Sequence, residues 1–118
     1  MKKQSLSLGS FFIIILFTFS FVQSSEISIV KGKARIIDGD TIEINSEKIR
    51  FGGIDTPEKK EIGHRFSKKK LSEKIGNNMV TCVREKNKDR WGRTVGECFV
   101  NEESLSSFMV QNGYACDY

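Results

Sequence analysis

The sequence has few of the residues that serve soft metal sites or rigid turns, with one histidine, one proline and three cysteines among 118 residues. His64 has no cysteine or second histidine near it, so we interpret it as a surface or helix-packing residue. No repeat or low-complexity tract appears after the first two dozen residues, which excludes a solenoid. The single proline, Pro57, marks a turn between two kinds of sequence pattern.

The chain also lacks a long hydrophobic run. Its most apolar stretch, residues 11–22, is about a dozen residues long and too short to span a bilayer comfortably. Two lysines precede this stretch and small residues follow it, which is typical of a secretory signal covering residues 1–24. We therefore expect a secreted or periplasmic protein with one domain, residues 25–118, and no stable membrane association. The alternative is an uncleaved segment that tethers the domain to a membrane.

Net charge is a weak guide to the partner. The formal charge is +4, and it falls to about +2 when Lys2 and Lys3 leave with the signal. Positive residues cluster at 68–70 and alternate through 84–90, where a phosphate backbone would be attracted. Each cluster is equally consistent with a solvated face.

Two of the cysteines lie in strand-like runs separated by a polar turn region. If these runs form a hairpin with Cys82 opposite Cys98, the two side chains share a face and can form a disulfide. Such a bridge would contribute roughly 3 kcal/mol to a small exported domain. The alternative is two buried free thiols. Cys116 is then left over, either free or paired between molecules.

Hydrophobic spacing predicts strands at 29–37, 41–45 and 48–54 before Pro57, and two more at about 79–84 and 94–100. Ile62, Phe66, Leu71 and Ile75 predict a helix after the third strand, ended by a Gly-Asn-Asn sequence.

After the fifth strand we expect a short helix capped by Asn101, with Leu105, Phe108 and Met109 facing inward and Gly113 as its stop. Five strands with helices in these two places predict an α+β protein, a β-barrel with helices of the OB-fold type.

Charged residues in three short motifs point to phosphodiester chemistry. Asp40 and Asp55 fall at strand edges, where carboxylates can enter a cleft and bind a hard cation such as calcium or magnesium. Glu58 follows across Thr56 and Pro57, and it is placed to orient or deprotonate a water molecule.

Arg50 and Arg93 are candidate phosphate ligands, because a guanidinium group matches the forked oxygens of a phosphate. Arg50 and Asp55 are an odd number of residues apart, so a regular strand would place them on opposite faces. We therefore predict that the strand is broken or bulged at Gly52 and Gly53.

The segment from Asp89 to Arg93 lies in the loop between the fourth and fifth strands. Arg90 and Trp91 in this loop are candidate substrate-binding residues, with the indole able to stack on a base or sugar. The alternative is that Trp91 is a packing residue.

These motifs resemble the staphylococcal nuclease, or thermonuclease, family. The similar stretches are Asp38 to Ile42, Arg50 to Glu58, Asp89 to Arg93 and Met109 to Ala115. The resemblance implies an OB-fold and calcium-dependent cleavage of DNA or RNA with little sequence specificity. It also implies calcium ligation by Asp40, Asp55 and the main-chain carbonyl of Thr56.

In the same way the resemblance implies that Glu58 acts on water and that Arg50 and Arg93 hold the phosphate. Members of the family usually continue well beyond the Gly-Tyr-Ala motif, so we expect this chain to lack their C-terminal segment. The leading hypothesis is an exported, monomeric, calcium-dependent nuclease. The alternative is an OB-fold module that binds nucleic acid or a protein without cutting.

Overall fold

The predicted first strand is divided in two at Lys33 in the computed structural model, which describes residues 26–118. Its halves are β1 (Ile29–Gly32) and β2 (Ala34–Asp38), and they pair with different neighbours. The predicted signal at 1–24 lies outside the described residues. Within them, no helix is long and apolar enough to cross a membrane.

The other strands are β3 (Thr41–Ile44), β4 (Glu47–Phe51), β5 (Ile54–Asp55), β6 (Val80–Arg84), β7 (Thr94–Val100), β8 (Glu103–Ser104) and β9 (Cys116–Asp117). The main sheet is mixed and has the order β1-β6-β7-β4-β3-β2, with β8 paired to β7, and β5 and β9 form a separate two-stranded sheet. Neighbours pair antiparallel except β4 and β7, which are parallel.

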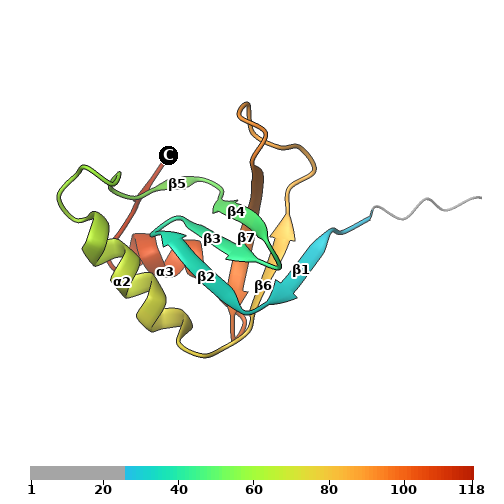
Figure 1. The fold of residues 1–118 in the computed structure, drawn as a ribbon, viewed down its shortest axis with the longest axis horizontal. Helices are drawn as coiled ribbons and strands as arrows, with labels where there is room; N and C mark the ends of the chain where they lie inside the picture. Colours follow the sequence, from blue (N-terminus) through green and yellow to red (C-terminus); the bar gives the residue numbers. More distant parts are fainter. Residues whose placement is uncertain (1–25) are drawn as a thin grey trace, which may run out of the picture.

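The two ends of this sheet, β1 and β2, are consecutive in the chain, so the sheet curls into a barrel (Figure 1). Counting β1 and β2 as one bent strand gives the five strands that the sequence predicts, and the OB-fold prediction is confirmed.

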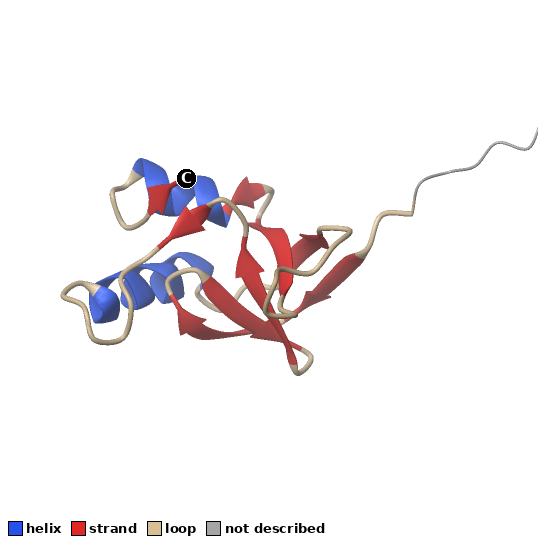
Figure 2. Cartoon of the chain, turned by 90° about the horizontal axis from the view of Figure 1, so that it is seen from above, coloured by secondary structure: helices blue, strands red, loops and turns tan. Residues whose placement is uncertain are grey.

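Two helices, α2 (His64–Ile75) and α3 (Leu105–Gln111), lie at the end of the barrel opposite β1 (Figures 1 and 2). The predicted helix is present, but two of the four residues whose spacing predicts it, Ile62 and Phe66, are not buried. Ile62 precedes the helix and is 99% exposed, and Phe66 is 53% exposed. The buried face consists of Ser67, Leu71 and Ile75, which recur every four residues, so Phe66 falls on the flank beside it.

The predicted cap of the second helix is also wrong. Asn101 and Glu102 both have positive φ and form the turn between β7 and β8. The N-cap is Ser104, whose Oγ accepts a hydrogen bond of 3.2 Å from Ser107 N. Asparagine suits both a cap and a left-handed turn, so the residue type alone does not separate these roles.

Apolar side chains fill the barrel, with Ile42, Ile44, Ile49 and Phe51 fully buried. Leu71, Ile75, Leu105 and Met109 of the helices complete this core, and Phe108 is only partly buried against it.

Cys82 on β6 lies opposite Cys98 on β7, and a disulfide joins them inside the core. The predicted pairing is confirmed. Cys116 is an exposed free thiol.

Candidate active site

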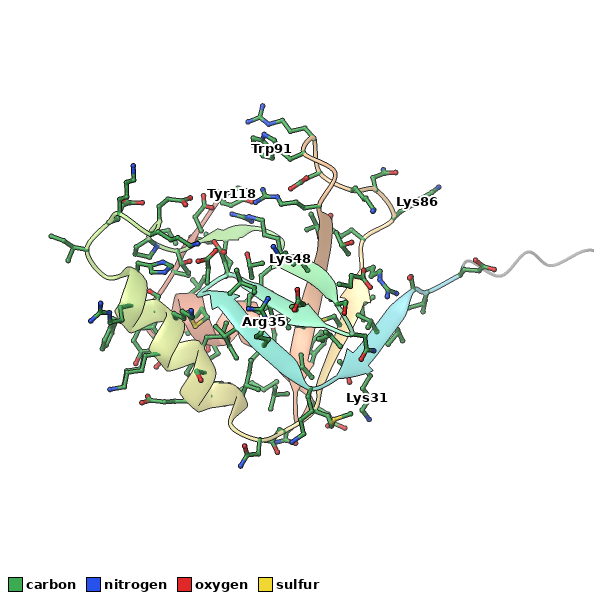
Figure 3. All side chains as sticks on the ribbon, in the orientation of Figure 1. Lys31, Arg35, Lys48, Lys86, Trp91 and Tyr118 are labelled. Atoms are coloured by element: carbon green, nitrogen blue, oxygen red, sulfur yellow. A yellow bond between two sulfur atoms is a disulfide. The ribbon has the colours of Figure 1, made fainter. Side chains whose placement is uncertain are left out.

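A cleft of about 580 Å³ contains every residue that the sequence analysis assigned to metal, phosphate, water or base. Its walls come from the turn between β2 and β3, the segment from β4 to Glu58, and the loop between β6 and β7. Trp91 stands at the tip of that loop, on the same side of the barrel as Tyr118 (Figure 3). The candidates lining the cleft are Asp40, Arg50, Asp55, Thr56, Glu58, Arg90, Trp91 and Arg93.

Asp40 is held firmly in the turn between β2 and β3, where it is 8% exposed. Its Oδ1 accepts a hydrogen bond of 2.9 Å from Thr41 Oγ1, and its Oδ2 accepts one of 3.2 Å from Thr56 N. Gly39 makes this close approach possible, because a Cβ there would lie 2.9 Å from Ser67 Cβ of α2. The carboxylate is therefore fixed between the barrel and the segment that follows β5.

The predicted break between Arg50 and Asp55 is present. β4 ends at Phe51, Gly53 has φ +78°, and β5 begins one residue later. A left-handed residue at this point reverses the alternation of side chains, so Arg50 and Asp55 meet on one side. They form an ion pair through Arg50 Nη2.

Arg50 is the centre of the cleft's charge network. Its Nη2 also lies 3.6 Å from Asp40 Oδ2, and its Nη1 donates hydrogen bonds to Phe51 O at 3.0 Å and Tyr118 Oη at 3.2 Å. Burial would lower the pKa of Arg50, but the charge of Asp40, followed by Tyr118 and Asp55, outweighs it and the pKa is raised. The guanidinium group is therefore a permanent cation between two carboxylates.

Tyr118 reaches the cleft through a pairing that the sequence analysis did not predict. β9 pairs antiparallel with β5, with Cys116 opposite Asp55. Tyr118 N then donates a hydrogen bond of 3.0 Å to Gly53 O. The segment after α3 thus supports both Asp55 and Arg50, and two-residue strands give too little pattern to be found in a sequence.

The segment that carries Glu58 is anchored by its neighbours. Glu58 N donates to Glu61 Oε1 at 2.8 Å, and His64 Nδ1 lies 3.0 Å from Pro57 O. His64 Nε2 is also 3.7 Å from Asp38 Oδ1. The Glu58 side chain is exposed and has no hydrogen bond to any other described residue. Of the two roles expected for His64, these contacts agree with the helix-packing one, because the residue links α2 to the loop before it.

Asp89 organises the loop between β6 and β7. Its Oδ1 accepts hydrogen bonds from the backbone N–H groups of Trp91 and Arg93, at 3.0 and 2.8 Å. Its Oδ2 accepts from Arg93 Nε at 2.6 Å. Desolvation would raise the pKa of Asp89, but the hydrogen bonds from Arg93 and Trp91 lower it overall. Arg93 is thus oriented through Nε, and no other described carboxylate lies within 4 Å of its two terminal nitrogens.

Trp91 is 66% exposed, which argues against the alternative of a packing residue. The guanidinium carbons of Arg90 and Arg93 lie 4.3 and 5.0 Å from its ring centroid. The loop therefore presents an aromatic face bracketed by two cations beside the cleft.

The donor atoms of the cleft suit a hard cation. Asp40 and Asp55 both contact Arg50 Nη2, and Thr56 Oγ1 is buried without a hydrogen-bond partner. Among residues 26–118, no three His, Cys, Asp or Glu side chains gather into a ready-made metal site. Oxygen from the main chain and from water would have to complete the coordination, as calcium sites permit.

Comparison with known proteins relates this chain to one family and to several curated proteins. Residues 48–118 match the family model described as Staphylococcal nuclease homologue. The matched range includes Arg50, Asp55, Glu58 and Arg93. The succinoglycan biosynthesis protein ExoI of Rhizobium meliloti (strain 1021) is 30% identical over 97 residues, covering 73% of this chain and 51% of that protein.

An uncharacterized endonuclease of Escherichia coli O157:H7 is 35% identical over 89 residues, covering 71% of this chain and 58% of that protein. A micrococcal nuclease of Shigella flexneri is 30% identical over 97 residues, covering 71% and 55%. The chain thus spans about half the length of these relatives. With its fold, its cleft and a family match over residues 48–118, which is more than half of its length, this chain belongs to the staphylococcal nuclease family.

Proposed function

We propose that this protein is a calcium-dependent nuclease that hydrolyses phosphodiester bonds of DNA or RNA with little sequence specificity. The observation that carries the proposal is the position of Arg50, which lies between Asp40 and Asp55 in a cleft also lined by Glu58 and Arg93. Two relatives with nuclease in their names support the same activity.

Asp40, Asp55 and the carbonyl oxygen of Thr56 are the residues that would hold calcium. Bound calcium would neutralise the two carboxylates and polarise a nonbridging P–O bond, which makes the phosphorus more electrophilic. The buried position of Asp40, fixed by hydrogen bonds to Thr41 and Thr56, keeps its oxygens directed at the cleft.

Arg50 and Arg93 would bind the nonbridging oxygens of the phosphate. Arg50 now pairs with Asp55 through Nη2, so phosphate binding would exchange a carboxylate partner for a phosphate partner. Arg93 is held at Nε by Asp89, which leaves its two terminal nitrogens to form a forked contact. Both contacts strengthen as charge builds on the phosphate in the transition state.

Glu58 would take the proton of the attacking water. Its carboxylate has no hydrogen bond to another described residue, while its backbone is held by Glu61 and the preceding carbonyl is held by His64. A general base needs this combination of a fixed backbone and an uncommitted side chain.

The residues that line the cleft support the proposal of low sequence specificity. Contacts made by Arg50 and Arg93 would reach phosphate oxygens, which are the same in every nucleotide. Arg90 and Trp91 add a cationic stacking surface that accepts any base or sugar. We further propose that the protein acts as a monomer and is exported to the cell exterior or periplasm.

The test is hydrolysis of single-stranded DNA by the purified protein with calcium, and again with excess chelator. We expect cleavage that stops on chelation and falls at least about a hundredfold in Glu58→Gln. Glu102→Gln is the matched control, because Glu102 is an exposed glutamate in the turn between β7 and β8. Intact DNA that is nevertheless retarded in a gel would refute the nuclease and support the non-catalytic binding module.

A further inference from the structure

The candidate cleft does not end at Glu58. A second hollow shares Asp55, Thr56, Pro57 and Glu58 with the cleft and continues along α2 and the segment after α3. Phe66 and Tyr114 line its far end. A linear polymer held in the cleft therefore has a continuous path toward the two helices.

Phe66 and Tyr114, which line this path, belong to a cluster of three aromatic rings and two lysines. The ring centroids of Phe66 and Phe108 lie 5.5 and 5.9 Å from that of Tyr114. Lys70 Nζ lies 5.3 Å from the Phe66 centroid and 6.0 Å from the Tyr114 centroid, and Lys74 Nζ lies 4.9 Å from that of Phe108. We call these five residues the aromatic patch. Phe66 is its most accessible ring, at 53% exposed.

The surrounding charge is positive. In the described part of the chain, no carboxylate lies within 4 Å of Arg65, Lys68 or Lys69, which are all exposed on α2. The lysines of the patch itself are partly neutralised, because Lys70 lies 3.4 Å from Glu73 and Lys74 lies 2.6 Å from Glu103. Exposed aromatic rings among unpaired cations are the combination that binds nucleic acid strands.

We propose that the aromatic patch binds the part of a single-stranded DNA or RNA that extends beyond the reacting phosphodiester. Phe66 stacks on an unpaired base, and Lys70 pairs with the adjoining phosphate. The strand is single because the faces of paired bases are already stacked within a duplex. This inference deepens the proposed function, since it depends on a strand that passes through the cleft.

The test measures the binding of a labelled single-stranded oligonucleotide of about ten nucleotides, which is within the usual site size of an OB-fold. All proteins carry Glu58→Gln so that the strand is not cut. We expect Phe66→Ala and Lys70→Ala each to raise Kd at least about fivefold, which corresponds to losing one stacked base or one phosphate contact.

Two matched controls come from residues that line neither the cleft nor the second hollow. Lys31→Ala removes an exposed lysine on β1, on the opposite side of the barrel (Figure 3). Met79→Ala removes an apolar side chain that is 47% exposed, close to the exposure of Phe66. Both should leave Kd within about twofold. Lys70 is partly exposed and does not belong to the hydrophobic core, so the result for Lys70→Ala stands even if Phe66→Ala loses stability.

Unchanged Kd in both patch variants would overturn the inference, and so would an equal loss of affinity for duplex of the same length. A small diester, bis(4-nitrophenyl) phosphate, reports the cleft alone when Glu58 is intact. If the protein hydrolyses this diester but the patch variants bind the oligonucleotide with unchanged Kd, the proposed nuclease activity is supported and the strand-binding role of the aromatic patch is refuted. If Phe66→Ala weakens binding of the strand but the protein hydrolyses no diester, the strand-binding role of the patch is supported and the proposed nuclease activity is refuted.

Discussion

Loss of the Cys82–Cys98 disulfide should lower the free energy of unfolding by about 3 kcal/mol. The two cysteines are 16 residues apart in sequence, and the chain-entropy model gives this value for a loop of that size. The free energy of unfolding of a small domain is about 5–15 kcal/mol, so the bridge accounts for a substantial share of it. The corresponding fall in Tm is about 12–24 °C.

The comparison that isolates the bridge uses one sequence in two redox states. Reduction keeps every side chain in place, whereas substitution by alanine would also empty core volume around two fully buried residues. Because both cysteines are inaccessible, the reductant must be added to unfolded protein, which is then refolded in its presence. Cys116→Ser in both samples prevents exchange with the exposed thiol.

Urea unfolding followed by far-ultraviolet circular dichroism is the suitable measurement. Trp91 is 66% exposed in the folded state, so its fluorescence would report the transition poorly. Unfolding curves that coincide for the oxidised and reduced proteins would refute the reasoning. They would mean that the pairing of β6 with β7 restricts the unfolded chain as much without the bond as with it.

Three other changes test the charge networks. Arg84 donates hydrogen bonds of 2.8 and 2.7 Å to Glu47, and these contacts lower the pKa of Glu47 below its ordinary 4.5. The pair should therefore add on the order of 0.5 kcal/mol to the free energy of unfolding above about pH 4.5. As the pH falls further, the free energies of unfolding of wild type and Glu47→Gln should converge. A difference that stays constant in urea titrations from pH 7 to 3 would contradict this. Asp89→Ala should lower kcat/KM for DNA about tenfold by releasing Arg93, while Asp89→Asn, which keeps the acceptor for the backbone N–H groups, should fall less. Arg50→Lys should lower kcat/KM about a hundredfold or more with little change in Tm, because an ammonium group cannot form the forked contact; near-normal kinetics would remove Arg50 from the phosphate site.

Residues close together in sequence made most of the barrel predictable. The alternation through Ile42 and Ile44 marks β3, and the pair of glycines between Arg50 and Asp55 indicates the break that lets both side chains face the cleft. These signals are local, because the side-chain period of a strand is set within a few residues.

The features that were missed depend on distant segments or on ambiguous residue types. Tyr118 contacts Arg50 from 68 residues away, through a pair of two-residue strands. Ile62 is spaced like a core residue of α2, yet the helix begins two residues later and leaves it in solvent. Asn101 was read as a cap, although it forms the turn before β8. Tertiary pairing decides such cases, and sequence spacing does not report it.

The junction at which the barrel closes bears on how the chain folds. β1 pairs only with β6, and Ile29 lies opposite Val83, so its partner emerges from a ribosome roughly fifty residues later. Until then residues 29–32 are an open strand edge, the kind of surface through which incomplete chains associate. Synthesis that slows before β6 should accordingly favour aggregates over native protein, even though all three strands of the meander from β2 to β4 have already been made.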